Sequence, residues 1–160
     1  IPNFPKRGIT FRDIMPLLSN PEAFAYVVHE IAREWKGKVD VVAALEARGF
    51  IFGVPVALAL GVPFVAVRKK GKLPGPTLGT TYDLEYGSDT IEIQSGRIVP
   101  TARVLLVDDL LATGGTAAAA CALIEKADAH VVGAAFVIEL SELGGRTKLP
   151  SIPIQSLVTY

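Results

Sequence analysis

Two adjacent carboxylates and the small residues after them are the part of the sequence best suited to chemistry. Asp108 and Asp109 end the apolar run Val104–Val107, and a loop rich in glycine and threonine, Leu110–Gly115, follows them. Helix N-termini present unpaired N–H groups to anions, and glycine lets the backbone close around a phosphate. Because two acids would repel a phosphate held there, they indicate a ligand that also brings a metal ion or sugar hydroxyls. The pattern therefore predicts a site for a substrate with both a phosphate and a diol.

Two other short segments carry charge where strands are expected to end. Glu46 and Arg48 follow the apolar run 39–45, and an Arg near a Glu is more often a surface ion pair than a ligand site. Four of the five residues in 68–72 are basic, and prolines and glycines follow them. Such a run is usually a solvated surface or a nonspecific anion patch, but it also fits a highly charged leaving group.

The composition excludes several classes of protein. Sixteen basic residues balance sixteen acidic ones, so the basic excess of proteins that coat nucleic acids is missing. The single cysteine, Cys121, allows neither an intrachain disulfide nor a cysteine-rich zinc site, and it suits a cytoplasmic protein. Charges, glycines or prolines interrupt every apolar run before about 18 residues, so no membrane span is expected. Walker A, Rossmann, zincin and nucleophile-elbow motifs are absent.

Hydrophobic periodicity predicts one α/β domain over residues 1–160, with a mostly parallel central sheet flanked by helices. Asn20 and Pro21 are typical of a helix start, with Asn20 as N-cap. Residues 1–20 are expected to form an irregular N-terminal arm, and residues 68–94 a long flexible loop (68–81) followed by a hairpin arm (82–94). The expected helices are 21–36, 50–60 and 116–126, and the expected core strands are 39–45, 63–67, 103–107, 131–138 and 154–158.

The segment Val104–Thr116 resembles the phosphoribosyl-pyrophosphate (PRPP) binding motif of the type I phosphoribosyltransferases. The sequence of its second part, Val-Asp-Asp-Leu-Leu-Ala-Thr-Gly-Gly-Thr, is similar to that of the family members that act on adenine. Three other segments agree with that branch and follow in the same order: the arm Phe4–Ile14, the turn Glu46–Phe50, and the basic loop with its hairpin, Arg68–Gly87. The resemblance covers about residues 4–160 and implies the type I phosphoribosyltransferase fold.

The resemblance also implies a role for each segment that binds PRPP. Asp108 and Asp109 would hold its ribose hydroxyls, directly or through Mg²⁺, which is the expected cofactor. The 5′-phosphate would be bound by Ala112, Thr113, Gly114, Gly115 and Thr116. The pyrophosphate would be bound by Glu46, Ala47, Arg48, Gly49, Arg68, Lys69 and Lys72, with a non-proline cis peptide at Glu46–Ala47.

The base would be recognised by the arm and by the residue after the acid pair. The implied adenine-binding residues are Thr10, Phe11, Arg12 and Leu110, with main-chain donors and acceptors supplied by Thr10 and Arg12. From its residue type alone, Phe11 fits a core aromatic equally well. Glu85 is the implied catalytic residue, accepting the purine proton or bonding near N7, and water is the alternative acceptor.

The reaction implied is transfer of the 5-phosphoribosyl group from PRPP to N9 of adenine, giving AMP and pyrophosphate for purine salvage. One alternative is the same transfer to another base, such as hypoxanthine, guanine or xanthine. Another is a PRPP-sensing regulatory protein, although such proteins commonly add a DNA-binding domain or a basic face, and this sequence shows neither. The family is usually dimeric, which implies a homodimer with no nucleic-acid or membrane partner.

Overall fold

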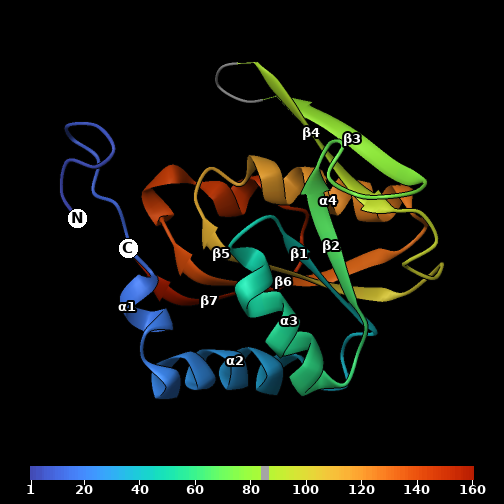
Figure 1. Ribbon diagram of the computed structural model, residues 1–160, viewed down its shortest axis with the longest axis horizontal. Coiled ribbons are helices and arrows are strands. Elements are labelled where there is room, and N and C mark those ends of the chain that lie inside the picture. The colour runs from blue at the N-terminus through green and yellow to red at the C-terminus, as the bar shows by residue number, and fades with distance from the viewer. Residues whose placement is uncertain (84–86) are drawn as a thin grey trace.

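The computed structural model describes residues 1–83 and 87–160, which fold around one seven-stranded sheet (Figure 1). Its strand order is β3-β4-β2-β1-β5-β6-β7. The five strands from β2 to β7 in this order are mutually parallel, and the β3–β4 hairpin joins antiparallel at the edge of β2. The strands are β1 (Val41–Leu45), β2 (Phe64–Lys69), β3 (Thr77–Asp83), β4 (Ser88–Gln94), β5 (Arg103–Leu111), β6 (His130–Glu139) and β7 (Ile154–Thr159). The expected α/β class with a mostly parallel sheet is confirmed.

Helices cover both faces of the sheet and bury two apolar clusters. Alternate residues of a strand point to opposite faces, so Val42 and Ala44 of β1 pack with one cluster while Ala43 and Leu45 pack with the other. The first cluster lies under α1 (Met15–Leu18), α2 (Pro21–Trp35) and α3 (Gly49–Leu60), and the second lies under α4 (Gly115–Lys126). The strands are buried on both sides, which explains their nearly continuous apolar sequence.

Local sequence signals account for the ends of α2 and α3. The side chain of Asn20 accepts hydrogen bonds from the backbone N–H groups of Glu22 and Ala23, each at 3.1 Å, as expected of an N-cap. Gly61 ends α3 in the left-handed conformation, with φ of 70°. Trp35, at the end of α2, lies over Gly133 of β6, where a Cβ atom would come within 1.8 Å of the indole ring.

Three expectations about the elements were wrong. Residues 77–81, placed in the long loop, belong to β3, because this stretch of small and β-branched residues pairs along its whole length with β4. Strand β5 does not end at Val107 but continues through the acid pair to Leu111, since β6 offers pairing partners up to Glu139. The arm is not wholly irregular either, because it contains α1.

Two short 3₁₀ turns between β6 and β7 had no counterpart in the expectations. They are η1 (Ser141–Leu143) and η2 (Gly145–Lys148). Single turns of this kind have too few residues to produce a hydrophobic period, so a periodicity argument does not detect them. Within the residues described, no helix has both the length and the apolar character needed to cross a membrane.

Candidate active site

The loop between β5 and α4 forms a small cavity at the helix N-terminus. Gly114 takes a left-handed conformation (φ of 77°) as the N-cap of α4, and no side chain caps the helix. The free N–H groups of the first turn therefore remain available to a ligand. The cavity has a volume of about 100 Å³ and is lined by Asp108 and by residues 110–117, which include all five residues expected to bind the 5′-phosphate.

The two acids of β5 have different surroundings. Asp109 is 4% exposed, and its Oδ2 lies 2.8 Å from Nε of Arg48, at the start of α3. Asp108 lines the loop cavity, and its Oδ1 accepts a hydrogen bond from the backbone N–H of Asp109 at 2.9 Å. Burial and the neighbouring charge of Asp109 raise the pKa of Asp108 well above the ordinary value. One carboxylate is thus neutralised by an arginine, and the other faces the cavity.

The turn after β1 lies against this acid pair. A Cβ atom on Gly49 would come within 2.8 Å of Oδ1 of Asp108, so only glycine allows α3 to begin this close to β5. The peptide bond Glu46–Ala47 is cis, as the resemblance implied. The carboxylate of Glu46 accepts from Nη2 of Arg68 at 2.7 Å and from the backbone N–H of Lys69 at 2.9 Å, and the guanidinium lowers the pKa of Glu46.

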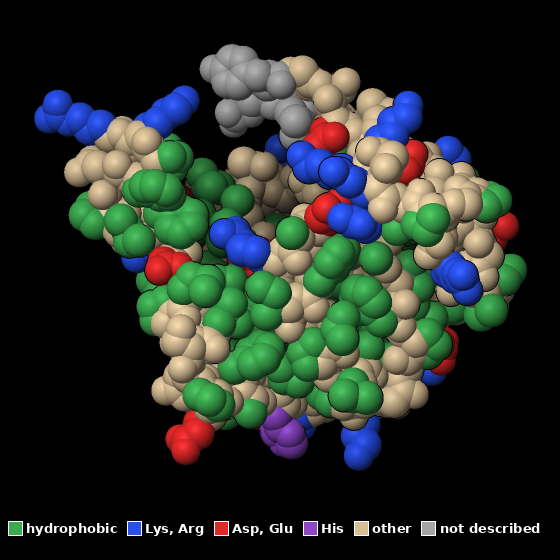
Figure 2. Space-filling view, in the orientation of Figure 1, with side chains coloured by type: hydrophobic (Ala, Val, Ile, Leu, Met, Phe, Trp, Pro, Cys, Tyr) green, Lys and Arg blue, Asp and Glu red, His purple; other side chains and the backbone are tan. Residues whose placement is uncertain are grey.

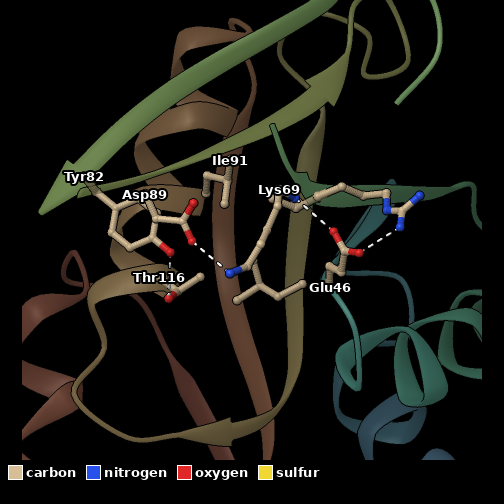
Figure 3. Close-up of a pocket in the computed structure, with 9 residues that line it drawn as sticks. Glu46, Lys69, Tyr82, Asp89, Ile91 and Thr116 are labelled. Carbon is tan, nitrogen blue, oxygen red and sulfur yellow. Dashed lines mark hydrogen bonds and ion pairs between the residues drawn. The ribbon is translucent and has the colours of Figure 1, made fainter. Parts of the chain in front are cut away.

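The hairpin closes a second cavity, of about 240 Å³, beside the same turn (Figure 3). Nζ of Lys69 lies 3.1 Å from Oδ2 of Asp89 in β4, and their hydrogen bond raises the pKa of Lys69 and lowers that of Asp89. The hydroxyl of Tyr82 in β3 lies 3.1 Å from Oγ1 of Thr116, so the hairpin contacts the first turn of α4 directly. Sequence reasoning missed Asp89 and Tyr82, because it placed both in a hairpin arm without knowing what that hairpin covers.

A third cavity, of about 540 Å³, lies between the N-terminal arm and the segment that follows β6. The N-terminal arm and the C-terminus, which follows β7, lie at the same side of the molecule (Figure 1), and Cζ of Arg12 lies 3.7 Å from the centroid of the Tyr160 ring. The space-filling view shows a hollow between this arm and the charged surface near the β3–β4 hairpin (Figure 2). The cavity is lined by Gly8, Ile9, Thr10, Arg12, Leu140, Glu142 and Leu143.

The expected adenine residues divide between two cavities. Thr10 and Arg12 line the large cavity of the arm, whereas Leu110 lines the loop cavity. Phe11 is half-buried and meets Phe4 edge to face, with ring centroids 5.2 Å apart. The residues Leu140, Glu142 and Leu143 were missed, since the sequence around them carries no motif or periodicity that would single them out.

Lys72 is exposed, and its carbonyl oxygen accepts a hydrogen bond from Nη1 of Arg68 at 3.0 Å. Glu85, the expected catalytic residue, lies outside the described residues.

The carboxylate of Asp108 is of a chemical type that suits a magnesium ion. Across residues 1–83 and 87–160, no group of three or more His, Cys, Asp or Glu side chains is arranged to hold a metal. Mg²⁺ in phosphate-binding sites typically takes only one or two carboxylates and fills its other positions with water and substrate oxygens. The carboxylate of Asp108 at the loop cavity could supply such a ligand.

Comparisons with known proteins agree with this geometry. Residues 17–154 match the phosphoribosyl transferase domain family. An adenine phosphoribosyltransferase of Trichodesmium erythraeum is 54% identical over 161 residues, covering 100% of this chain and 95% of the relative. A crystal structure of adenine phosphoribosyltransferase from Thermoanaerobacter pseudethanolicus superimposes with a TM-score of 0.95 at 49% identity, covering 100% of this chain and 94% of that one.

A further solved structure carries ligands. It is adenine phosphoribosyltransferase from Saccharomyces cerevisiae, complexed with D-2,5-dideoxy-2,5-imino-altritol 1,6-bisphosphate and adenine. It has a TM-score of 0.93 and 46% identity, and the match covers 98% of this chain and 92% of the yeast chain. With the fold, the loop cavity and these matches in agreement, the chain belongs to the adenine phosphoribosyltransferases, within the phosphoribosyl transferase domain family.

Proposed function

We propose that this chain transfers the 5-phosphoribosyl group of PRPP to N9 of adenine, producing AMP and pyrophosphate. The observation that carries the proposal is the gathering of three cavities at one edge of the sheet. They follow the carboxyl ends of β1, β2, β5 and β6, the edge where ligands bind in open parallel sheets. Their volumes, about 100, 240 and 540 Å³, suit a phosphate, a pyrophosphate and a base with its ribose.

The phosphoribosyl part of PRPP is held by the loop cavity in this proposal. The N–H groups of residues 112–116 and the hydroxyls of Thr113 and Thr116 bind the 5′-phosphate. The carboxylate of Asp108 accepts hydrogen bonds from the ribose hydroxyls. Asp109 does not contact PRPP in this proposal. It acts through Arg48, because their ion pair fixes the turn that faces the pyrophosphate.

The leaving pyrophosphate is bound by the Glu46–Gly49 turn and by three cations, Arg68, Lys69 and Lys72. Two of these cations are paired with carboxylates, Arg68 with Glu46 and Lys69 with Asp89. A phosphate that enters the cavity competes with these carboxylates for the same donors. Bound Mg²⁺ would supply neutralisation of the charge that develops on the leaving pyrophosphate.

Adenine lies in the cavity between the arm and residues 140–143, next to the ribose site. A main-chain acceptor from the Thr10–Arg12 arm pairs with the exocyclic amine of adenine and repels the oxygen at the same position of hypoxanthine. N9 attacks C1′ as the C1′–oxygen bond to pyrophosphate breaks, through an oxocarbenium-like state. Glu85 accepts the proton that the purine must lose. Enclosure of the ribose excludes water, which would otherwise hydrolyse PRPP.

The proposal includes a homodimer joined through the exposed face of α3. This helix is apolar all round, and while Phe52 and Val56 are fully buried, Val54 is 49% and Leu58 82% exposed. A helix with apolar residues on every side is typically buried on every side. Figure 2 shows the resulting hydrophobic surface. Sedimentation should give a dimer that Leu58→Glu converts to a monomer; a monomeric parent chain would contradict the proposal.

The direct test of the reaction is incubation with PRPP and Mg²⁺ and, separately, adenine, hypoxanthine, guanine or xanthine. We expect AMP and an equal amount of pyrophosphate from adenine, and little nucleotide from the other bases. A different preferred base would assign the chain to another phosphoribosyltransferase activity. Tight PRPP binding without any nucleotide would favour the regulatory alternative. A cytoplasmic location, with the free, buried Cys121 kept reduced, is also part of the proposal.

A further inference from the structure

We propose that Gly145 and Arg146, which lie far from the phosphate loop in sequence, position that loop for the 5′-phosphate of PRPP. This inference rests on the proposed function and names two positioning residues for its phosphate site. Neither residue lines the loop cavity, so both act through the backbone that does.

Gly145 lies in direct backbone contact with the loop. A Cβ atom at Gly145 would come within 2.1 Å of the carbonyl oxygen of Ala112 and 2.9 Å of the backbone nitrogen of Gly114. Conversely, a Cβ atom at Gly114 would come within 2.3 Å of the carbonyl oxygen of Gly145. Gly145 is buried and its φ is not in the left-handed region, so space and not conformation requires glycine at this position.

Arg146 fixes the position of Gly145 against the sheet. Its Nε donates to Oε1 of Glu139 at 2.9 Å and its Nη2 to Oε2, a bidentate pair, while Nη1 donates to the carbonyl oxygen of Ile154 at 3.2 Å. The Glu139 side chain is only 7% exposed and also accepts from the Ser156 hydroxyl of β7. The guanidinium lowers the pKa of Glu139, so the pair is ionised at neutral pH. Residue 145 is thus tied to the carboxyl end of β6 and to the first half of β7.

The loop needs such support because it has little of its own. Its residues Ala112, Thr113 and Gly114 carry small side chains, and no side chain caps α4. The N–H groups that bind a phosphate must point toward one centre, and that requires a defined backbone at the Ala112 carbonyl and the Gly114 nitrogen. These are the two atoms that Gly145 touches. The ion pair of Arg146 with the buried Glu139 therefore sets the shape of the phosphate site without lining it.

The first test replaces Gly145 by Ala, which forces the Ala112 carbonyl away without changing any charge. Calorimetric titration of the variant with PRPP and Mg²⁺ should show affinity reduced by about tenfold or more, as misplaced binding groups cause. Steady-state kinetics should show the same rise in KM for PRPP, with KM for adenine and kcat within about twofold of the parent, the pattern of lost uniform binding.

Two further variants test the inference if the Gly145→Ala chain does not fold. Glu139→Gln with Arg146→Met removes both charges of the pair together, so the buried Glu139 position is not left with an unpaired charge. Arg146→Lys keeps the charge but loses the bidentate geometry, and its KM for PRPP should lie between those of the parent and the double variant. Lys148→Met, on the same turn but exposed, is the matched control and should bind PRPP as the parent does.

The outcomes separate the inference from the function on which it rests. A parent chain that neither binds PRPP nor makes AMP would contradict the proposed function itself. With an active parent, unchanged PRPP affinity in the folded Gly145→Ala and double variants would overturn the positioning role. Equal increases in the KM values for PRPP and adenine would also overturn it, because they would indicate general loosening of the fold.

Discussion

The phosphate end and the base end of the proposed site are built in different ways. The phosphate end is made by central elements: β5 delivers Asp108, α4 begins at the loop, and the buried Gly145 supports the loop from behind. The base end is made by an exposed arm that forms one isolated bridge, Pro2 with Thr10, and stacks on the ring of Tyr160. The first depends on the core of the domain, and the second depends on a few surface contacts.

This difference implies that the two ends respond differently to mutation. Changes at the phosphate end alter the folding free energy and PRPP binding together, because the same buried groups serve both. Changes at the base end alter adenine recognition with little effect on stability, since an exposed arm contributes little to the core.

The largest effect is expected at Glu85, which lies outside the described residues. Replacing it by Gln keeps the shape of the side chain but removes the proposed proton acceptor. We expect kcat to fall by roughly 10²–10⁴-fold while PRPP affinity changes little. Asp83→Asn, which changes an exposed carboxylate two positions away, is the control and should retain kcat. Parent-like turnover by Glu85→Gln at saturating substrates would reassign proton transfer to water.

The acid pair tests the link between stability and binding at the phosphate end. The pKa of Asp108 is raised in the folded protein, so the ionised carboxylate destabilises the fold once the pH exceeds the unfolded value of 3.8. Asp108→Asn should therefore raise the Tm at pH 7, and the gain should shrink as the pH falls towards 3.8 and vanish below it. The same change should weaken PRPP binding by on the order of 10–100-fold, as expected for a lost charged hydrogen bond.

Asp109→Asn is the matched comparison for that variant. It should lower the Tm, since it leaves Arg48 without its carboxylate. The free energy of unfolding should fall by only about 1 kcal/mol, because the guanidinium remains partly in water. Thermal denaturation of both variants, with and without PRPP, decides the point. Equal shifts of Tm in the two variants would contradict the different roles assigned to the acids.

At the base end, Tyr160→Leu removes the ring over which Arg12 stacks. Exposed cation–π contacts contribute about 0.5–1 kcal/mol, so KM for adenine should rise about two- to fivefold. KM for PRPP and the Tm should stay close to the parent values. Tyr160→Phe keeps the ring face and should behave as the parent does. If Tyr160→Leu instead changed KM for PRPP, the separation of the two ends would be wrong.

The smallest effect is expected at an ion pair remote from both ends. Arg103 holds the pKa of Asp40 at about 2, and the pair is exposed. A carboxyl with a lowered pKa stabilises the fold above its unfolded value of 3.8, and this contribution disappears as the pH falls through about 2. Asp40→Asn should lower the Tm slightly at pH 7, and this loss should shrink as the pH falls from 3.8 through about 2, with both KM values unchanged at pH 7. Denaturation curves across this pH range provide the check.

Sequence reasoning succeeded where the signal is local. The apolar run before Asp108, the glycines after it and the Asn20-Pro21 helix start are each read within a few residues, and the structure has β5, α4 and α2 there. It also implied the arm, whose residues Thr10 and Arg12 line the large cavity.

Sequence reasoning failed where the signal is long-range. The pairing of Arg48 with Asp109, and of Lys69 with Asp89, joins residues that only the folded sheet brings together. The start of β3 at Thr77 was missed for the same reason, because its partner β4 determines whether that segment is a strand. The Gly145 contact with the loop is likewise absent from any local pattern.

The central claim is that the site makes a nucleotide from PRPP and adenine in preference to other bases, and a competition experiment tests it most directly. Adenine and hypoxanthine are supplied together with limiting PRPP and Mg²⁺, and the ratio of AMP to inosine monophosphate is measured. A site that hydrogen-bonds the exocyclic amine should favour adenine by about 10⁴-fold in kcat/KM. Comparable amounts of the two nucleotides would contradict the account.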